Sequence, residues 1–239
     1  MGRDTDTRDA DTPRHPLFHG RRKGRPLRPG QQALIDTRLP ELLIPRPTDG
    51  GGAIDLRTAF DTPVRALWLE IGFGGGEHLA WQAAHNPDIG MVGCEPFVNG
   101  VASLIRHLDQ GGLRNVRIYP DDARLLMDAL PAGGLERIFL LHPDPWPKRR
   151  HHGRRLVQRA WLDRVWEILA PGGVLRLATD DVGYLRWMLA RLTAHRGFRW
   201  TGAGLGDFTE RRADWPETRY EAKARRQARP PAYLEFQRC

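Results

Sequence analysis

Acidic side chains stand at places along the chain where short apolar runs end. Glu70 closes one run before a glycine-rich turn, Glu95 and Asp122 follow the next two runs, and Asp144 stands between two prolines. In a parallel sheet the carboxyl ends of the strands meet at one edge, where ligands bind. We therefore expect these carboxylates to line one pocket for a ligand with cationic and hydroxyl groups.

The glycine-rich turn after Glu70 discriminates between adenosyl ligands. Gly72 and Gly74 let a ligand approach the backbone closely. Glu77, however, stands where a dinucleotide-binding fingerprint has its third glycine, and carboxylates repel a pyrophosphate. S-adenosylmethionine carries an ammonium and a sulfonium and no phosphate, so acids attract it. The turn therefore favours S-adenosylmethionine over a dinucleotide such as NAD.

The next two acids fit other parts of the same ligand. Glu95 can accept hydrogen bonds from both hydroxyls of a ribose. Asp122 can accept a hydrogen bond from the amino group of adenine, and its neighbour Asp121 is the alternative acceptor. Each acid alone is explained equally well as a helix N-cap or a surface charge. Three of them at successive strand ends favour a shared ligand.

A basic run follows Asp144 and indicates a polyanionic substrate. Its arginines, uninterrupted by any acid, are Arg149, Arg150, Arg154 and Arg155. The whole chain has a net charge of +8 and a pI near 10.3, which favours nucleic acid as a partner. We expect the run to contact phosphates, the alternative being a rigid, solvated loop.

Alternating apolar runs and helical-period segments predict the elements that position these residues. Repeated βα units of this kind build a parallel sheet covered by helices. The expected strands are residues 66–71, 91–95, 116–119, 137–141, 174–178, 199–201 and 233–236. The expected helices are 31–39, stopped by Pro40, then 76–84, 97–108, 123–130, 156–169 and 184–195. The prediction is an α/β fold with an open, doubly wound sheet of about seven strands.

Composition divides the chain into three parts. Residues 1–30 are polar with little to bury and predict a flexible arm, whose basic segment 21–25 is either an RNA contact or a solvated tail. Residues 31–65 predict a helix and a connector rich in proline and glycine. Residues 66–239 predict a single catalytic domain.

The two cysteines and the hydropathy pattern indicate the cellular compartment and argue against a bound metal or a membrane span. Cys94 and Cys239 offer neither a disulfide framework nor metal-ligand spacing, so we expect a reducing cytoplasm and no bound metal. No apolar run approaches the roughly 20 residues that span a bilayer, so no membrane association is expected. We expect a monomer or homodimer without an obligate protein partner.

Taken together, these residues closely resemble the family of tRNA (guanine-N7-)-methyltransferases. The resemblance covers the chain from about residue 67 onward. It is carried by Glu70-Ile71-Gly72-Phe73-Gly74, by Pro143-Asp144-Pro145-Trp146-Pro147-Lys148, which is the most specific motif, and by Thr218-Arg219-Tyr220-Glu221. It implies a class I, Rossmann-like methyltransferase that uses S-adenosylmethionine to methylate N7 of the variable-loop guanine in tRNA.

The resemblance also implies roles for individual residues. Asp144 would be catalytic and would contact S-adenosylmethionine together with Glu70, Glu95 and Asp122, beside the turn of Gly72 and Gly74. The substrate contacts would be Lys148, Asp180, Thr218, Arg219, Tyr220 and Glu221. The tRNA would be gripped by the arginines between residues 149 and 155, and the polar arm before Gly30 has no counterpart in the family motifs.

The chemistry of guanine agrees with these roles. N7 carries an in-plane lone pair and no proton, so methyl transfer needs alignment more than a base. Asp144 can stabilise the positive charge that develops on the ring or hold the base by its N–H groups. Trp146 and Tyr220 are candidates to stack on an exposed guanine, with core packing as the alternative.

Two other activities are alternatives. Enzymes that methylate an exocyclic amino group of RNA or DNA have an Asp or Asn followed by two prolines and an aromatic residue, whereas a single proline separates Asp144 from Trp146. A tRNA-binding protein without catalysis is the alternative from another class. The full set of active-site acids argues against it.

Overall fold

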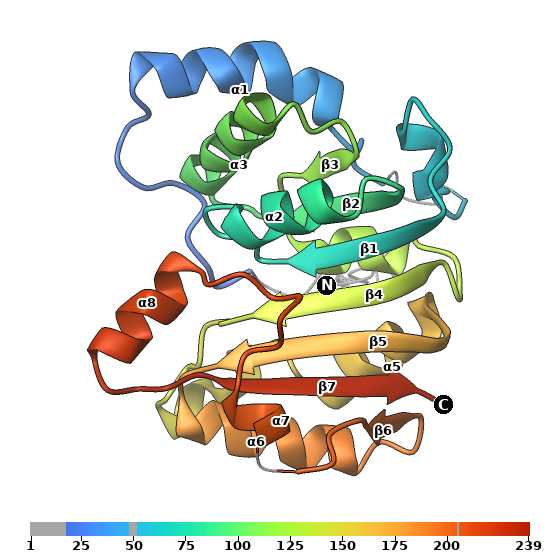
Figure 1. The fold of residues 1–239 in the computed structure, drawn as a ribbon, viewed down its shortest axis with the longest axis vertical. Coiled ribbons are helices and arrows are strands. Elements are labelled where there is room, and N and C mark those ends of the chain that lie inside the picture. Colours follow the sequence, from blue (N-terminus) through green and yellow to red (C-terminus); the bar gives the residue numbers. More distant parts are fainter. Residues whose placement is uncertain (1–17, 48–51, 205) are drawn as a thin grey trace, which may run out of the picture.

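The computed structural model describes residues 18–47, 52–204 and 206–239. In this part the chain forms one seven-stranded sheet with helices on both faces (Figure 1). The strands are β1 (Ala66–Ile71), β2 (Ile89–Cys94), β3 (Val116–Tyr119), β4 (Leu135–Leu141), β5 (Leu169–Thr179), β6 (Phe198–Trp200) and β7 (Ala232–Arg238). Their order in the sheet is β3-β2-β1-β4-β5-β7-β6, which confirms the predicted doubly wound α/β fold.

The pairing of the strands brings their carboxyl ends to one edge. β1 pairs in parallel with β2 and β4, so that Ile71 stands beside Cys94 on one side and Leu140 on the other. β3 and β5 continue the parallel sheet outward, and β7 runs antiparallel between β5 and β6. The strand order reverses between β1 and β4, where ligands of such sheets bind.

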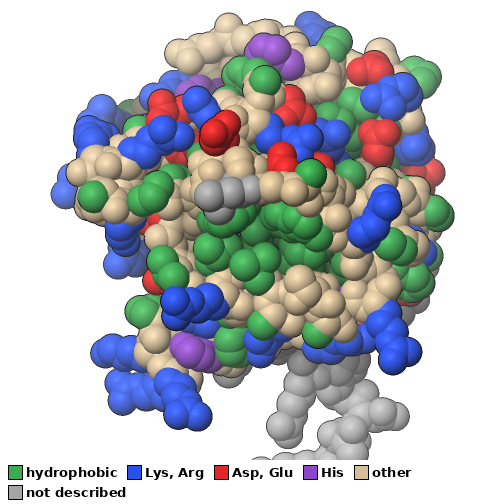
Figure 2. All heavy atoms as spheres, turned by 60° about the horizontal axis from the view of Figure 1, so that its bottom comes forward, with side chains coloured by type: hydrophobic (Ala, Val, Ile, Leu, Met, Phe, Trp, Pro, Cys, Tyr) green, Lys and Arg blue, Asp and Glu red, His purple; other side chains and the backbone are tan. Residues whose placement is uncertain are grey.

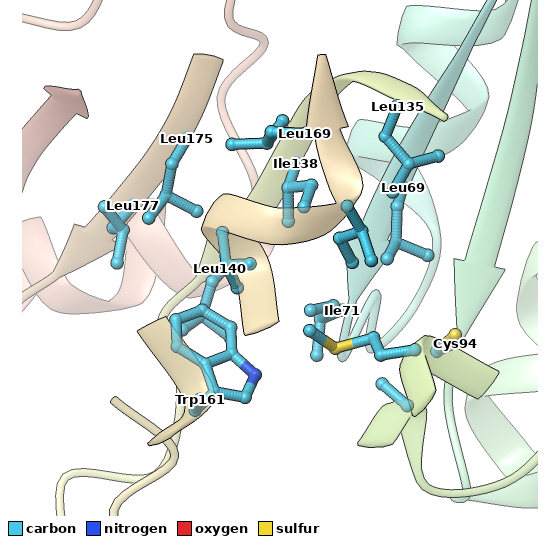
Figure 3. Packing of buried hydrophobic residues seen from close by; sticks show 14 of the residues in the cluster. Leu69, Ile71, Cys94, Leu135, Ile138, Leu140, Trp161, Leu169, Leu175 and Leu177 are labelled. Carbon is cyan, nitrogen blue, oxygen red and sulfur yellow. The ribbon is translucent and has the colours of Figure 1, made fainter. Parts of the chain in front are cut away.

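The helices are divided between the two faces. The described α-helices are α1 (Pro29–Leu42), α2 (Glu77–His85), α3 (Val98–Gly111), α4 (Ala123–Asp128), α5 (Arg159–Ile168), α6 (Val182–Thr193), α7 (Gly206–Thr209) and α8 (Arg219–Arg226), and two 3₁₀ helices span Leu56–Ala59 and Arg149–Arg154. α1, α2 and α3 share one apolar cluster with the sheet, and α4, α5 and α6 share another on the opposite face. In Figure 3, Trp161 of α5 lies beside Leu140 at the end of β4. Burial on both faces explains why the central strands are almost continuously apolar.

Some element boundaries differ from the prediction. α1 continues through Pro40 to Leu42, because a proline in the last turn removes one backbone hydrogen bond while Leu42 becomes buried. α5 begins at Arg159 rather than residue 156, and β5 begins directly at Leu169. α8 was not predicted, because its sequence is mostly polar and charged.

The N-terminal region is attached to the same core as the sheet. Most of the predicted flexible arm, residues 1–17, lies outside the described residues. α1 packs against α3 and β3, and the N–H of Ile44 donates to the carbonyl of Ile118 in β3. The three-part division of the chain therefore stays a prediction. Among the described helices, none combines the length and the apolar character needed to cross a bilayer.

Candidate active site

A cavity of about 1340 Å³ opens at the carboxyl edge of the parallel strands. All four acids that the sequence placed at strand ends line it, namely Glu70, Glu95, Asp122 and Asp144. The volume exceeds the roughly 300–1,000 Å³ of ordinary small-molecule sites. The cavity therefore has room for a nucleoside ligand and part of a second molecule.

Glu95 ties the glycine-rich turn to the end of β2. One of its carboxylate oxygens accepts the N–H of Gly74 and the other accepts the N–H of Phe97, both at 2.9 Å. Gly72 and Gly74 have φ angles of 72° and 57°, a conformation that favours glycine. Burial raises the pKa of Glu95, and its oxygens retain lone pairs for the hydroxyl groups of a ligand.

The start of α3 packs directly against this turn through a glycine that the sequence analysis did not single out. A Cβ atom built on Gly100 would overlap the carbonyl oxygen of Gly74. We predict that Gly100→Ala displaces the turn, lowers the free energy of unfolding by about 1–3 kcal/mol and weakens cofactor binding. Calorimetric titration with S-adenosylhomocysteine and thermal denaturation measure the two effects.

The matched control for this substitution is Gly30→Ala in α1. No atom lies within 4 Å of a Cβ built on Gly30, so alanine there leaves the site unchanged and stabilises the helix by at most about 1 kcal/mol. Equal cofactor affinity in the two variants contradicts the prediction for Gly100.

Asp121 and Asp122 point to different environments. Asp122 lines the cavity, and its Oδ1 accepts the N–H of Arg124 at 3.0 Å as the N-cap of α4. Asp122 also forms an ion pair with Arg124 at 2.5 Å, whereas Asp121 forms ion pairs with Arg22 at 2.7 Å and Arg46 at 3.2 Å. Burial opposes ionisation of Asp121, but the N–H of Asp122 and these arginines outweigh it and lower its pKa. The geometry favours Asp122 as the ligand-facing carboxylate.

Asp144 lies on a loop whose backbone is held in an uncommon shape. His142 and Trp146, two residues to either side, have φ angles of 50° and 44°. The N–H of His142 donates to the carbonyl of Ala178 at 2.8 Å, which continues the sheet pairing. The Asp144 side chain is exposed at the cavity. Residues other than glycine seldom adopt positive φ, and such strain clusters at functional sites.

Trp146 is a rim residue rather than a core residue. Its ring is half-buried and meets the rings of His19 and His151 edge-on, with centroids 6.1 and 5.9 Å apart. The guanidinium of Arg154 lies 5.0 Å from the ring centroid. The indole therefore stands among cationic and exposed groups beside Asp144, which suits stacking on a base.

Arg155 differs from the other arginines of the run because it is buried. Only 3% of the residue is exposed. Its Nε donates to the carbonyl of Pro145 at 2.8 Å, and its guanidinium lies over the rings of Tyr184 and Trp187. This burial argues against a contact between Arg155 and RNA, because the side chain holds the loop of Asp144, and the contact stays a prediction.

We predict that Arg155→Ala destabilises the fold more than Arg154→Ala does. Loss of the hydrogen bond and of the two aromatic contacts is expected to lower the free energy of unfolding by about 2–4 kcal/mol. The exposed Arg154, which loses only its contact with the Trp146 ring, is expected to change it by at most about 1 kcal/mol. Urea denaturation measures both values, and equal stability of the two variants contradicts the assignment.

The remaining basic side chains of this run face solvent. Lys148, Arg149, Arg150 and Arg154 are all exposed, the arginines within a short 3₁₀ helix that follows the loop. Figure 2 shows Lys and Arg side chains along the left and lower margins of one face of the molecule, and others at its right margin and among acids in its upper half. These exposed cations are available for phosphates.

The segment from Thr218 to Glu221 begins α8 beside the cavity. Thr218 and Tyr220 line the cavity, and the ring of Tyr220 approaches Gly74. Arg219 forms an ion pair with Glu77. Glu221 is fully buried, and its carboxylate accepts hydrogen bonds from the N–H of Thr218 and the hydroxyl of Tyr233. Glu221 thereby fixes the start of the helix, and its predicted contact with the substrate stays a prediction.

Asp180 lies beside His142, a residue of the cavity wall to which the sequence analysis gave no role. Its carboxylate lies 3.9 Å from Nδ1 of His142, which lines the cavity, and 3.3 Å from Arg229. Burial lowers the pKa of His142, partly offset by Glu221 and Asp180. The lowered pKa favours the neutral imidazole, in which one nitrogen donates a hydrogen bond and the other accepts one.

A basic N-terminal segment also borders the cavity. Residues 18–21 line it, and the chain then runs along the start of α3. There the N–H of Val98 donates to the carbonyl of Arg22, and Asn99 exchanges hydrogen bonds with Gly24 and Arg25. Sequence reasoning noted the basic charge, but no local pattern pairs this segment with α3.

Comparisons with known proteins agree with this geometry. Residues 64–233 match the family model described as "Putative methyltransferase". The chain is 54% identical to the tRNA (guanine-N(7)-)-methyltransferase of Rhodospirillum rubrum, over 92% of this chain and 87% of that protein. It is 46% identical to the protein of the same name from Rhizobium meliloti, over 93% and 95% of the two chains.

Solved structures agree on the fold. The 16S rRNA methyltransferase KamB superposes with a TM-score of 0.54 and 18% identity, over 77% of this chain and 90% of that one. The 16S rRNA (adenine(1408)-N(1))-methyltransferase of Catenulisporales acidiphilia gives a TM-score of 0.50 and 14% identity, over 73% and 88%. At these identities the similarity shows a shared architecture.

Proposed function

Because this chain belongs to the family of tRNA (guanine-N7-)-methyltransferases, we propose that it methylates N7 of the variable-loop guanine in tRNA, with S-adenosylmethionine as the methyl donor. The observation that carries the proposal is the convergence of four carboxylates on one cavity at the carboxyl edge of the sheet. An exposed cationic run lies directly after the last of these acids. The proposal extends to a cytoplasmic enzyme that acts as a monomer or homodimer.

The residues around the cavity fit S-adenosylmethionine by their chemistry. Glu70 would face the ammonium, Glu95 the ribose hydroxyls and Asp122 the adenine amino group, each an acceptor opposite a donor or a cation. A Cβ atom built on Gly72 would meet no atom within 4 Å, so the space beside this glycine stays open to the ligand. A pyrophosphate would meet the same carboxylates unfavourably, which supports this cofactor over a dinucleotide.

The chain's contribution to methyl transfer is alignment and electrostatics. S-adenosylmethionine supplies an electrophilic methyl group when bound. Tyr220 and Trp146 line the cavity and would hold a purine by its faces. The exposed carboxylate of Asp144 would stabilise the positive charge that develops on the imidazole ring as N7 is alkylated. No side chain is required to remove a proton from N7.

The remaining polar residues fit the acceptor. Thr218 lines the cavity. Asp180 lies beside His142, and Arg219 forms an ion pair with Glu77; His142 and Glu77 both line the cavity. The cations proposed to contact the tRNA backbone are Lys148, Arg149, Arg150 and Arg154. Phosphate contacts of this kind supply affinity and register, while the pocket selects the base.

The test is methyl transfer from labelled S-adenosylmethionine to an unmodified tRNA transcript, followed by digestion to nucleosides. We expect the label in 7-methylguanosine, and its loss when the variable-loop guanine is replaced by adenine. Label on an exocyclic nitrogen would contradict the proposed target atom. Label in 7-methylguanosine from both transcripts would contradict the proposed position.

A further inference from the structure

We propose that His78 is a positioning residue that orients the Glu70 carboxylate toward the amino-acid end of the cofactor. The inference rests on the proposed function, in which Glu70 faces the ammonium group. It concerns a residue of α2 that no motif singled out. The argument starts from a chain of hydrogen bonds that leads from the cavity into the core.

Glu70 and His78 form a buried pair. The two residues are each 2% exposed, and Nδ1 of His78 lies 2.7 Å from Oε2 of Glu70. Glu70 lines the cavity. Within the described residues, no hydrogen bond occupies its other oxygen, Oε1. One oxygen is therefore fixed from behind while the other is available to a ligand.

Gln82, one turn further along α2, determines the tautomer of the imidazole. Nε2 of Gln82 donates to the carbonyl of Asp214 at 2.8 Å, which fixes the orientation of the amide. The same nitrogen lies 3.2 Å from Nε2 of His78, so this ring nitrogen accepts a hydrogen bond. The proton of the neutral ring must then reside on Nδ1, from which it is donated to Glu70.

Aromatic neighbours limit rotation of the imidazole. The ring of Phe139 meets it edge-on with centroids 4.8 Å apart, and the ring of Trp215 lies 6.0 Å away. His78 is thereby held in one orientation by packing and at both nitrogens by hydrogen bonds. A carboxylate at the end of a side chain with three rotatable bonds gains directional precision from such a partner.

The same contacts link the cofactor side to the acceptor side. Trp215 and Asp214 belong to the segment that leads into α8, and Trp215 packs against Tyr233. Tyr233 in turn donates to Glu221, which fixes the start of α8 at Thr218. His78 therefore stands at the junction between the carboxylate for the cofactor and the segment proposed to meet the guanine.

The test compares two ligands that differ only at the end read by Glu70. S-adenosylhomocysteine contains the amino-acid group, whereas 5′-methylthioadenosine lacks it. We expect His78→Phe, which keeps an aromatic ring but removes the donor, to weaken S-adenosylhomocysteine about tenfold and 5′-methylthioadenosine less than about twofold by calorimetry. His78→Asn, which places an amide donor near the position of Nδ1, is expected to restore most of the affinity.

Gln82→Ala keeps the test decisive if His78→Phe does not fold. It leaves the imidazole in place but removes the donor to Nε2, and we expect a selective loss of about threefold for S-adenosylhomocysteine. Equal losses for both ligands, or none, would overturn the proposal. Equal losses would show that His78 supports the fold in general. The absence of any loss would show that the Glu70 carboxylate is oriented without His78.

Glu70→Gln separates failure of this inference from failure of the proposed function. If Glu70→Gln does not selectively weaken S-adenosylhomocysteine, the assignment of Glu70 to the ammonium is overturned, and the role of His78 with it. If Glu70→Gln is selective and the His78 variants are not, the cofactor assignment stands and the positioning role alone is overturned.

Discussion

Replacement of Asp144 by alanine is expected to abolish most methyl transfer while leaving tRNA binding intact. Asp144 is exposed at the cavity, on a loop held by Arg155 and by the sheet pairing of His142. Loss of one preorganised group that stabilises developing charge typically costs about 10²–10³-fold in turnover. Single-turnover methylation with saturating cofactor and tRNA measures this loss, and a filter-binding assay measures the affinity for tRNA.

The Asp144→Asn variant separates charge from shape. Asparagine keeps an acceptor oxygen and nearly the same volume but lacks the negative charge. Because the purine becomes cationic during transfer, we expect Asn to lose nearly as much turnover as Ala. Substantial activity in the Asn variant would assign Asp144 to holding the base instead.

Asp36→Ala is the matched control for both Asp144 variants. Asp36 is a carboxylate on the surface of α1 that contacts Gln32 and does not line the cavity, and we expect full turnover from this variant. Undiminished turnover of Asp144→Ala would overturn the catalytic assignment, whatever the control shows.

The acids of the cavity were predictable because parallel strands buried on both faces are read as continuous apolar runs. β1 is buried along its whole length, so the place where it ends, and with it Glu70 and Gly72, is visible in the sequence. The same holds for Glu95 after β2. The rule that ligands bind at the carboxyl edge then groups these residues without knowledge of any contact.

The tertiary partners of charged residues were not predictable in this way. Arg155 and Arg154 are adjacent in one basic run, yet Arg155 packs over Tyr184 and Trp187 while Arg154 faces solvent. Glu221 is buried because Tyr233, 12 residues away, donates to it. Local composition cannot distinguish these cases, since the partner decides whether a charge is stabilised inside the fold.

Replacement of Arg149, Arg150 and Arg154 together by alanine is expected to weaken tRNA binding and to reduce its dependence on salt. All three side chains are exposed beside the loop of Asp144. Each cation that neutralises a phosphate releases counterions, so the slope of log K against log salt should fall by about 2–3. At low salt we expect about 10- to 100-fold weaker binding.

Removal of equal charge elsewhere provides the control for this triple variant. Arg57, Arg65 and Arg114 are exposed, and Arg65 and Arg114 stand just before β1 and β3, at the edge of the sheet opposite the cavity. Replacing these three by alanine lowers the net charge equally but removes no proposed phosphate contact. We expect the salt slope of this control to stay within about one unit of the original.

The two sets of variants together distinguish binding from chemistry. At saturating tRNA the triple variant should keep its turnover, because the exposed arginines contribute equally to ground-state and transition-state binding. Asp144→Ala should show the opposite pattern, with intact binding and lost turnover. An unchanged salt slope in the triple variant would mean that these arginines form a solvated surface. The phosphate contacts would then have to come from other cations bordering the cavity, such as the basic segment at residues 21–25.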